Sequence, residues 1–288
     1  MKDLPTSPRI AQIKRNRKVG RIRLVVLLII LLLSIIGALS YFSSHRSVII
    51  NKIVITGNSI IDSKELEQNV DEKISGRYIG LFARANFLIY PKHKIYNDLI
   101  SNFPRIESLS VGLEGLHTIH LNIKERAGSF LYCGLVLPLI KEDVGENCYF
   151  VNNDGYIFDK APYFSGDIYF KYYADIKMTK GGVLGSQVYE AARFHELARF
   201  IDGVASLGFK PIYLVNESDD SYSLYLKAKG DGLNPKVIFK EDNDLNTILD
   251  NFKTAMGEKE FANEINSKYD TLSYIDLRFK NKVLYKFQ

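Results

Sequence analysis

One uninterrupted apolar stretch constrains this chain more than any other part of its sequence. Residues 24–42 read LVVLLIILLLSIIGALSYF, carry no charge, and include only Ser34, Ser40 and Tyr41 as polar side chains. At about 1.5 Å per residue, a helix of this length spans roughly 28 Å, close to the hydrocarbon thickness of a bilayer. A helix in the core of a soluble protein would show a polar stripe, which is absent here. We therefore predict a transmembrane helix over residues 24–43, with the lipid bilayer as its partner.

Charges on the two sides of this stretch predict its orientation. Eight lysines and arginines precede Leu24 with a single acid, whereas Arg46 and Lys52 are the first basic residues after it. Basic residues stay on the cytoplasmic side, so residues 1–23 are predicted to form a basic cytoplasmic tail and the chain beyond the helix to be exported. A cleaved signal peptide is the alternative, since Ala38-Leu39-Ser40 resembles a cleavage site. The apolar run exceeds a usual signal sequence, which favours a retained anchor.

The net charge of +5 also reflects this tail, because the residues after it contain slightly more acids than bases. A basic chain would ordinarily suggest nucleic acid as a partner. Here the basic residues are accounted for by membrane topology, and we expect no nucleic-acid partner.

The two cysteines, Cys133 and Cys148, both fall in the predicted exported part. In an oxidising compartment they could pair, and closing a loop of this size would contribute about 3 kcal/mol in the chain-entropy model. The alternative is two buried free thiols in adjacent strands.

Residues 48–127 predict a small α+β unit. A strand over Val48–Ile55 ends at the turn Gly57-Asn58, and Asp62 can cap a helix with apolar residues at helical spacing. A second helix begins near Pro91, and two alternating runs over residues 109–123 read as a hairpin. The order is β-α-α-β-β.

Residues 128–288 predict a larger mixed, mainly antiparallel β domain with two helices, so the whole chain belongs to the α+β class. Asp154-Gly155 marks the bend of one hairpin. Helices are expected over residues 188–207 and 244–256. Strands are expected over residues 129–133, 135–140, 148–151, 156–158, 168–172, 212–215, 221–227, 237–240, 272–279 and 283–287.

Short motifs follow one another in a specific order. They are IVITGN at residues 53–58, FPRI at 103–106, KER at 124–126, FVNNDGYIF at 150–158 and YIDLRF at 274–279. Directly after a membrane anchor, this order resembles a POTRA domain, and more narrowly the FtsQ/DivIB family of bacterial cell-division proteins. Two positions depart from the family pattern. Gly128 stands where the family usually has proline, and Gly112–Leu116 replaces an aromatic-proline turn.

The resemblance implies a single-pass type II protein of the bacterial plasma (inner) membrane, located at the septum during cell division. It implies a divisome scaffold that links early and late division proteins of the cell cycle, contacts other divisome components, and binds FtsB/FtsL-like bitopic partners through its C-terminal strands. Carried over by position, Arg278 and Phe279 follow the "DL" of the last motif. The resemblance therefore predicts both as partner-binding residues.

The last predicted strand independently suggests a docking site. Val283, Tyr285 and Phe287 alternate with Leu284, Lys286 and Gln288, and the outer edge of such a strand can accept a strand from a partner. The alternative is that Lys286 is a charge that prevents edge-to-edge aggregation. We predict that the three apolar residues bind a partner by strand addition.

No set of residues predicts catalysis. His195-Glu196-Leu197-Ala198-Arg199 lacks the second histidine of H-E-x-x-H, and no nucleophile motif is present. We therefore expect no enzyme activity, cofactor, metal site or small-molecule substrate. Two alternatives stay open: a POTRA-bearing component of secretion or outer-membrane assembly, and an anchored extracytoplasmic enzyme with an unrecognised site.

Overall fold

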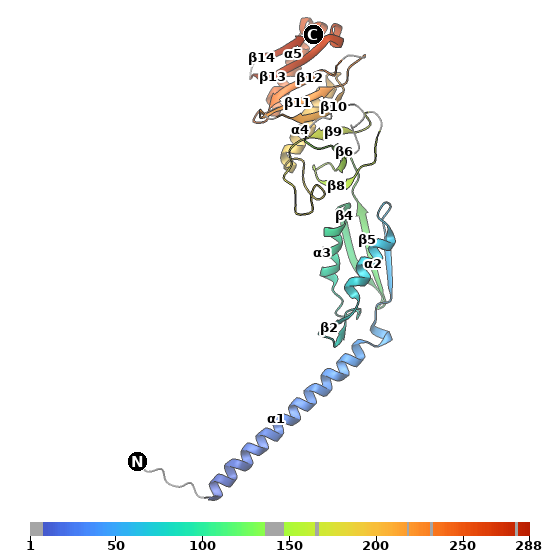
Figure 1. Cartoon of the computed structure of the whole chain (residues 1–288), viewed down its shortest axis with the longest axis vertical. Coiled ribbons are helices and arrows are strands. Elements are labelled where there is room, and N and C mark those ends of the chain that lie inside the picture. Colours follow the sequence, from blue (N-terminus) through green and yellow to red (C-terminus); the bar gives the residue numbers. More distant parts are fainter. Residues whose placement is uncertain (1–7, 136–146, 165–166, 218, 231–232, 280–281) are drawn as a thin grey trace, which may run out of the picture. The chain divides into compact units, whose positions relative to one another are not determined.

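The computed structural model describes residues 8–135, 147–164, 167–217, 219–230, 233–279 and 282–288 (Figure 1). The chain divides into an N-terminal unit, residues 1–125, and a C-terminal unit, residues 126–288. Its fold is α+β, with one apolar N-terminal helix and a large mixed sheet accompanied by several helices.

The apolar stretch lies in helix α1, Pro8–Ser43. Within its segment Arg17–Ser43, an 18-residue window has a mean hydropathy of 3.0 and is not buried by the rest of the protein, so the helix is long and apolar enough to cross a bilayer. The helix also includes much of the predicted tail. Pro8 occupies its first position, where the missing amide hydrogen is not needed, and no further proline interrupts it.

The N-terminal unit contains a three-stranded sheet in the order β1-β5-β4. Strand β1 runs parallel to β5, and β4 runs antiparallel to β5. After α1 the elements are the 3-10 helix Arg46–Val48, β1 (Lys52–Thr56), α2 (Ser63–Ile74), β2 (Arg77–Tyr78), β3 (Phe82–Ala83), α3 (Lys92–Asn102), β4 (Ile106–Glu114) and β5 (Thr118–Glu125).

The predicted β-α-α-β-β order is therefore present, with two corrections. The first strand was expected to begin at Val48, but Val48 ends the 3-10 helix and the strand begins at Lys52. The short hairpin β2–β3 between the two helices was not predicted, because each strand has only two residues. The core of the unit lies between the sheet and the two helices, and its fully buried side chains include Leu66, Val70, Ile95, Leu99, Ile119 and Leu121.

Two of the motif regions meet at the end of this sheet. Gly57 has φ +83°, and a Cβ there would come within 2.0 Å of the Ile123 carbonyl oxygen, so only glycine fits. The next turn is held by Glu125, whose carboxylate accepts hydrogen bonds from the amides of Ser59 and Ile61 at 2.7 and 3.0 Å. The Ile60 amide donates to the same carboxylate. The last residue of β5 thus fixes the turn after β1.

The C-terminal unit is built on a nine-stranded sheet in the order β14-β13-β12-β11-β10-β9-β6-β7-β8. Three neighbouring pairs are parallel (β12–β13, β9–β10 and β6–β9) and the others antiparallel. The strands are β6 (Phe130–Tyr132), β7 (Tyr149–Val151), β8 (Ile157–Lys160), β9 (Phe170–Tyr173), β10 (Pro211–Asn216), β11 (Ser221–Leu226), β12 (Lys236–Lys240), β13 (Leu272–Phe279) and β14 (Lys282–Phe287). The strand predicted over residues 135–140 lies outside the described residues apart from its first position.

The described part of this unit contains three α-helices, so the prediction of two was wrong. Helices α4 (Ala191–Ser206) and α5 (Leu245–Gly257) correspond to the predicted ones, whereas α6 (Lys259–Ser267) was missed. Helix α6 has only nine residues, of which Phe261, Ala262 and Ile265 are apolar, so the sequence offered few apolar positions from which to predict it. The main core contains side chains of the sheet together with Phe194, Leu197, Phe252 and others from the helices.

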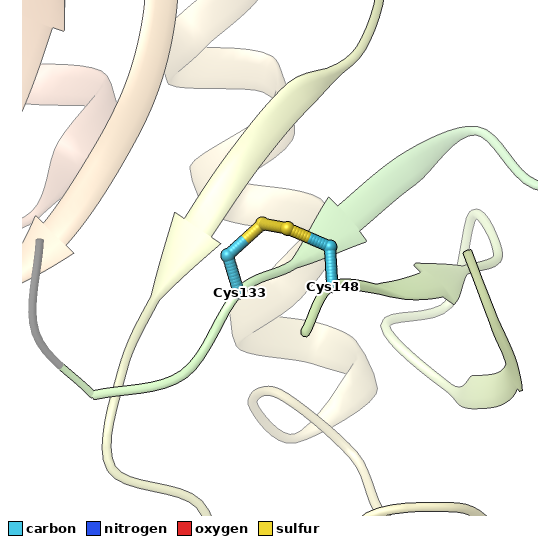
Figure 2. The surroundings of a disulfide bond; sticks show 2 residues. All are labelled: Cys133 and Cys148. Atoms are coloured by element: carbon cyan, nitrogen blue, oxygen red, sulfur yellow. A yellow bond between two sulfur atoms is a disulfide. The ribbon is translucent and has the colours of Figure 1, made fainter. Parts of the chain in front are cut away.

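A disulfide joins Cys133, just after β6, to Cys148, just before β7 (Figure 2). The described residues contain no free cysteine. The bond lies in a small cluster of buried side chains with Leu131 and Ala161, separate from the main core. Nearby, a Cβ on Gly128 would approach the Phe150 ring to 2.4 Å, so the ring occupies the space that a proline at this position would need.

Candidate functional site

The candidate site is the outer edge of the nine-stranded sheet, formed by the hairpin β13–β14. Strand β14 pairs antiparallel with β13, with Ile275 opposite Tyr285 and Asp276 opposite Leu284. Among the described residues, no strand pairs with the other side of β14. The backbone groups on that side are therefore available to a strand from another molecule.

Alternation along β14 separates its side chains between the two faces of the sheet. Val283 and Phe287 pack against the main core, on the side of α5 and α6. Tyr285 lies between them, with its ring centroid 5.3 Å from that of Phe261 in α6 and 5.5 Å from that of Phe287. The structure thus brings three of the five predicted partner-binding residues onto one face, where they also hold the strand to α6.

A polar contact strengthens this attachment. The Tyr285 hydroxyl donates a hydrogen bond of 2.6 Å to Glu264 of α6, and Lys268 lies 2.9 Å from the other oxygen of the same carboxylate. The hydrogen bond from Tyr285, and next the contact with Lys268, lower the pKa of Glu264. The same bond raises the pKa of Tyr285. Because the carboxyl pKa is lowered, the stability that this contact contributes is fully present at neutral pH. That stability is lost as the pH falls through the lowered pKa.

Beside the first residues of β14 the surface is hollow, with a volume of about 560 Å³. Three parts of the chain form its walls: the last turns of α5, the start of α6, and the beginning of β14. The lining residues are Asn251, Thr254, Ala255, Glu258, Phe261, Lys282 and Val283. A side chain from a strand paired with β14 could enter this hollow.

The remaining two predicted residues have different surroundings. Arg278 points to the face opposite the helices and forms a bidentate pair with Asp276, with Nε–Oδ1 and Nη2–Oδ2 distances of 3.0 and 2.7 Å. Asp276 is only 4% exposed, and its hydrogen bond raises the pKa of Arg278. The arginine therefore neutralises a buried carboxylate of its own strand. Phe279 ends β13 with its side chain 51% exposed.

Sequence reasoning missed the contribution of α6. Phe261 and Glu264 lie three residues apart on this helix and both contact Tyr285. The spacing of Phe261 and Ile265, four residues apart, was a signal for an amphipathic helix. The spacing of Asp276 and Arg278, two apart in a predicted strand, likewise indicated that both side chains share a face.

The described residues contain no group of three or more histidine, cysteine, aspartate or glutamate side chains that could hold a metal ion. His195, in the incomplete zinc motif, contacts Asp154 at 3.1 Å. In comparisons with known proteins, no protein-family model matches this sequence and no curated protein matches it significantly.

Proposed function

We propose that this chain is a non-catalytic, membrane-anchored scaffold of the bacterial division machinery. It captures FtsB/FtsL-like bitopic partners, which add a strand to the outer edge of β14. The observation that carries the proposal is this edge: a six-residue strand at the end of a large sheet, with no strand on its outer side in the described part of the chain.

Backbone pairing along β14 would supply affinity, and side-chain contacts would supply specificity. Leu284 and Tyr285 are exposed apolar side chains on opposite faces of the strand, so a paired strand could pack against both. Lys282 and Lys286 are also exposed. Their charges disfavour pairing between two copies of the same edge and favour a partner strand with acidic residues.

The assignment to division rests on the motif resemblance, which has a physical basis in the fold. The motif residues Gly57 and Glu125 act together to set the turn after β1. Arg126, which follows in the same motif, stacks over the Tyr156 ring at 4.5 Å in the C-terminal unit. These motif residues therefore have structural roles in the two units, which supports the use of the motifs in the proposal.

Helix α1 supports membrane anchoring by its length and composition. In the proposal, residues 1–23 face the cytoplasm and both folded units face the extracytoplasmic side, as the excess of basic residues before Leu24 indicates. The protein would then present β14 to partners anchored in the same membrane, at the division site.

The test is capture of partners by the tagged full chain from detergent-solubilised membranes of the source cells. We expect recovery of small single-pass proteins with a heptad-patterned helix. Phe279→Glu should abolish this capture, because it places a charge at an exposed apolar position beside the edge. Tyr163→Glu is the matched control, since Tyr163 is an exposed aromatic residue remote in sequence from β13 and β14.

Proline substitutions test backbone pairing directly. Successive amide groups along an antiparallel strand alternate between its two edges, so only one of Leu284→Pro and Tyr285→Pro removes an outward donor. That variant should retain its circular dichroism spectrum and lose capture. Undiminished capture by both variants in folded form would exclude strand addition. Recovery of only secretion or outer-membrane assembly components would assign the chain to that machinery instead.

A further inference from the structure

The hairpin β2–β3 and the loop after it carry an exposed apolar surface that the docking edge does not explain. Ile79 at the hairpin tip is 94% exposed, Leu88 is 74% exposed, and Leu81 and Ile89 are also exposed. We call these four side chains the hairpin patch. All of them belong to the N-terminal unit, and the hairpin follows α2 in Figure 1.

The backbone conformation at the hairpin tip does not account for the isoleucine at position 79. Residues 78–81 form a tight turn in which Leu81 donates its amide hydrogen to the Tyr78 carbonyl at 2.9 Å. Ile79 has φ +51° and Gly80 has φ +72°. A β-branched side chain is disfavoured in this left-handed region, where asparagine or glycine is usual. Ile79 therefore occupies a strained position without gaining burial inside the protein.

Hydrogen bonds attach this hairpin to the last turn of α1. The Ser43 hydroxyl accepts from the Ala83 amide at 3.1 Å, and the Ser43 carbonyl accepts from the Asn86 side chain at 3.1 Å. Ser43 and Asn86 are both buried. One helical turn earlier, the Ser40 hydroxyl donates to the Leu81 carbonyl at 2.8 Å.

These contacts define the direction in which the hairpin runs. Ala83 lies at the level of Ser43, and Leu81 lies at the level of Ser40, about 4.5 Å further back along the helix axis. The chain from β3 to the tip thus runs back along α1. If roughly 20 residues from Leu24 cross the hydrocarbon, Ser43 lies near the outer boundary of the bilayer. Leu81 and Ile79 then lie at or below that boundary.

Neighbouring residues fit a lipid surface. Tyr41 and Phe42 are exposed in the last turn of α1, as expected for aromatic side chains at a membrane interface. Between Gly76 and Asn97 the sequence contains four basic residues and no acid. Such a segment is attracted to anionic headgroups while its apolar side chains enter the acyl boundary.

We propose that the hairpin patch is a second membrane-contact element, which inserts Ile79 and Leu81 into the outer leaflet of the bilayer beside α1. This inference rests on the membrane anchoring in the proposed function. Its consequence is that the N-terminal unit is held against the bilayer at two points, by α1 and by the hairpin, and is oriented by both.

The experiment uses single cysteine variants of the full chain, each labelled with a nitrobenzoxadiazole fluorophore. The disulfide leaves no free cysteine among the described residues to react with the label. The chain is reconstituted at one copy per nanodisc, in equal parts of phosphatidylcholine and phosphatidylglycerol, with nitroxide-labelled lipid as the quencher. Three sites are compared: Ile79→Cys at the tip, Leu32→Cys within α1, and Ile60→Cys as the matched isoleucine control.

Ile60 is exposed like Ile79 but lies beyond the opposite end of β1, where its amide contacts Glu125. We expect blue-shifted emission and strong quenching at Ile79→Cys and Leu32→Cys, and neither effect at Ile60→Cys. Quenching at Leu32→Cys with none at Ile79→Cys would overturn the hairpin insertion and leave the anchor intact. A blue shift at Ile79→Cys without quenching would show that protein, and not lipid, surrounds the fluorophore, and would overturn the insertion. No quenching at Leu32→Cys would overturn both the anchor and the insertion.

Discussion

Replacing Glu125 by alanine removes the carboxylate that three consecutive amides share. Hydrogen bonds to a charged acceptor contribute about 1.5–3 kcal/mol each, but water can replace the acceptor at the exposed amides of Ser59 and Ile60. Of the three residues whose amides donate to Glu125, only Ile61 is buried. We therefore expect Glu125→Ala to lower the free energy of unfolding of the N-terminal unit by about 2–4 kcal/mol. Glu125→Gln keeps one acceptor without the charge and should cost about 1–2 kcal/mol.

The pH dependence provides an independent check. Burial raises the pKa of the Glu125 carboxyl, but the hydrogen bonds from Ile61, Ser59 and Ile60 together lower it more, so its net pKa lies below the ordinary value. A lowered carboxyl pKa contributes stability that is fully present above the unfolded-state pKa of about 4.3 and is lost as the pH falls through the folded-state pKa. The stability difference between the parent and Glu125→Gln should therefore shrink below about pH 4.3.

The chain contains no tryptophan, so an introduced one reports on a single unit. Tyr90→Trp places the probe against the core of the N-terminal unit. Urea denaturation of the full chain in detergent, followed by its fluorescence, gives the free energy of unfolding of that unit. Glu114→Gln, at an exposed glutamate ending β4, is the matched control. A loss within about 0.5 kcal/mol for Glu125→Ala, as expected for a plain surface change, would refute the reasoning.

Three further predictions concern the C-terminal unit. Replacing both cysteines of the disulfide by serine should lower its free energy of unfolding by about 3 kcal/mol, measured by denaturation, and an unchanged midpoint would contradict this. Gly128→Ala should lower it by about 1–3 kcal/mol through the clash with the Phe150 ring, whereas Gly257→Ala at the end of α5, with nothing within 4 Å of the new Cβ, should not destabilise this unit. Tyr285→Phe removes the hydrogen bond to Glu264, so amide hydrogen exchange in β14 should be faster than in the parent at neutral pH. Acidification should erase that difference, because it protonates Glu264 in the parent.

The elements that periodicity predicted well are those whose signals are local. Helix α2 begins after Asp62, whose side chain accepts from the Lys64 amide, and it buries Leu66, Val70 and Ile74 as their spacing indicates. By contrast, the hairpin β2–β3 depends on contacts with Ser43, which lies far away in the sequence. The parallel pairing of β1 with β5 joins segments about 65 residues apart, which no local pattern reveals.

The candidate site likewise combines features that local sequence patterns predict with features that depend on distant segments of the chain. Alternation placed Val283, Tyr285 and Phe287 on one face of a strand, and the structure shows them there. The hollow beside them was not predicted, because α6 forms part of its wall and this short helix was itself missed.

Because β5 is the middle strand of the N-terminal sheet, it determines when that sheet can form during synthesis. In the part of the chain that the structure describes, β1 and β4 pair only with β5, which is the last of the three to be made. At about 5–20 residues per second, the roughly 70 residues from Lys52 to Glu125 take about 4–14 s to appear. Until then neither earlier strand has a partner, and the sheet forms in one step once β5 emerges. A ribosome that stalls before Glu125 therefore leaves two unpaired strands, which quality-control proteases can recognise as part of an unfinished chain.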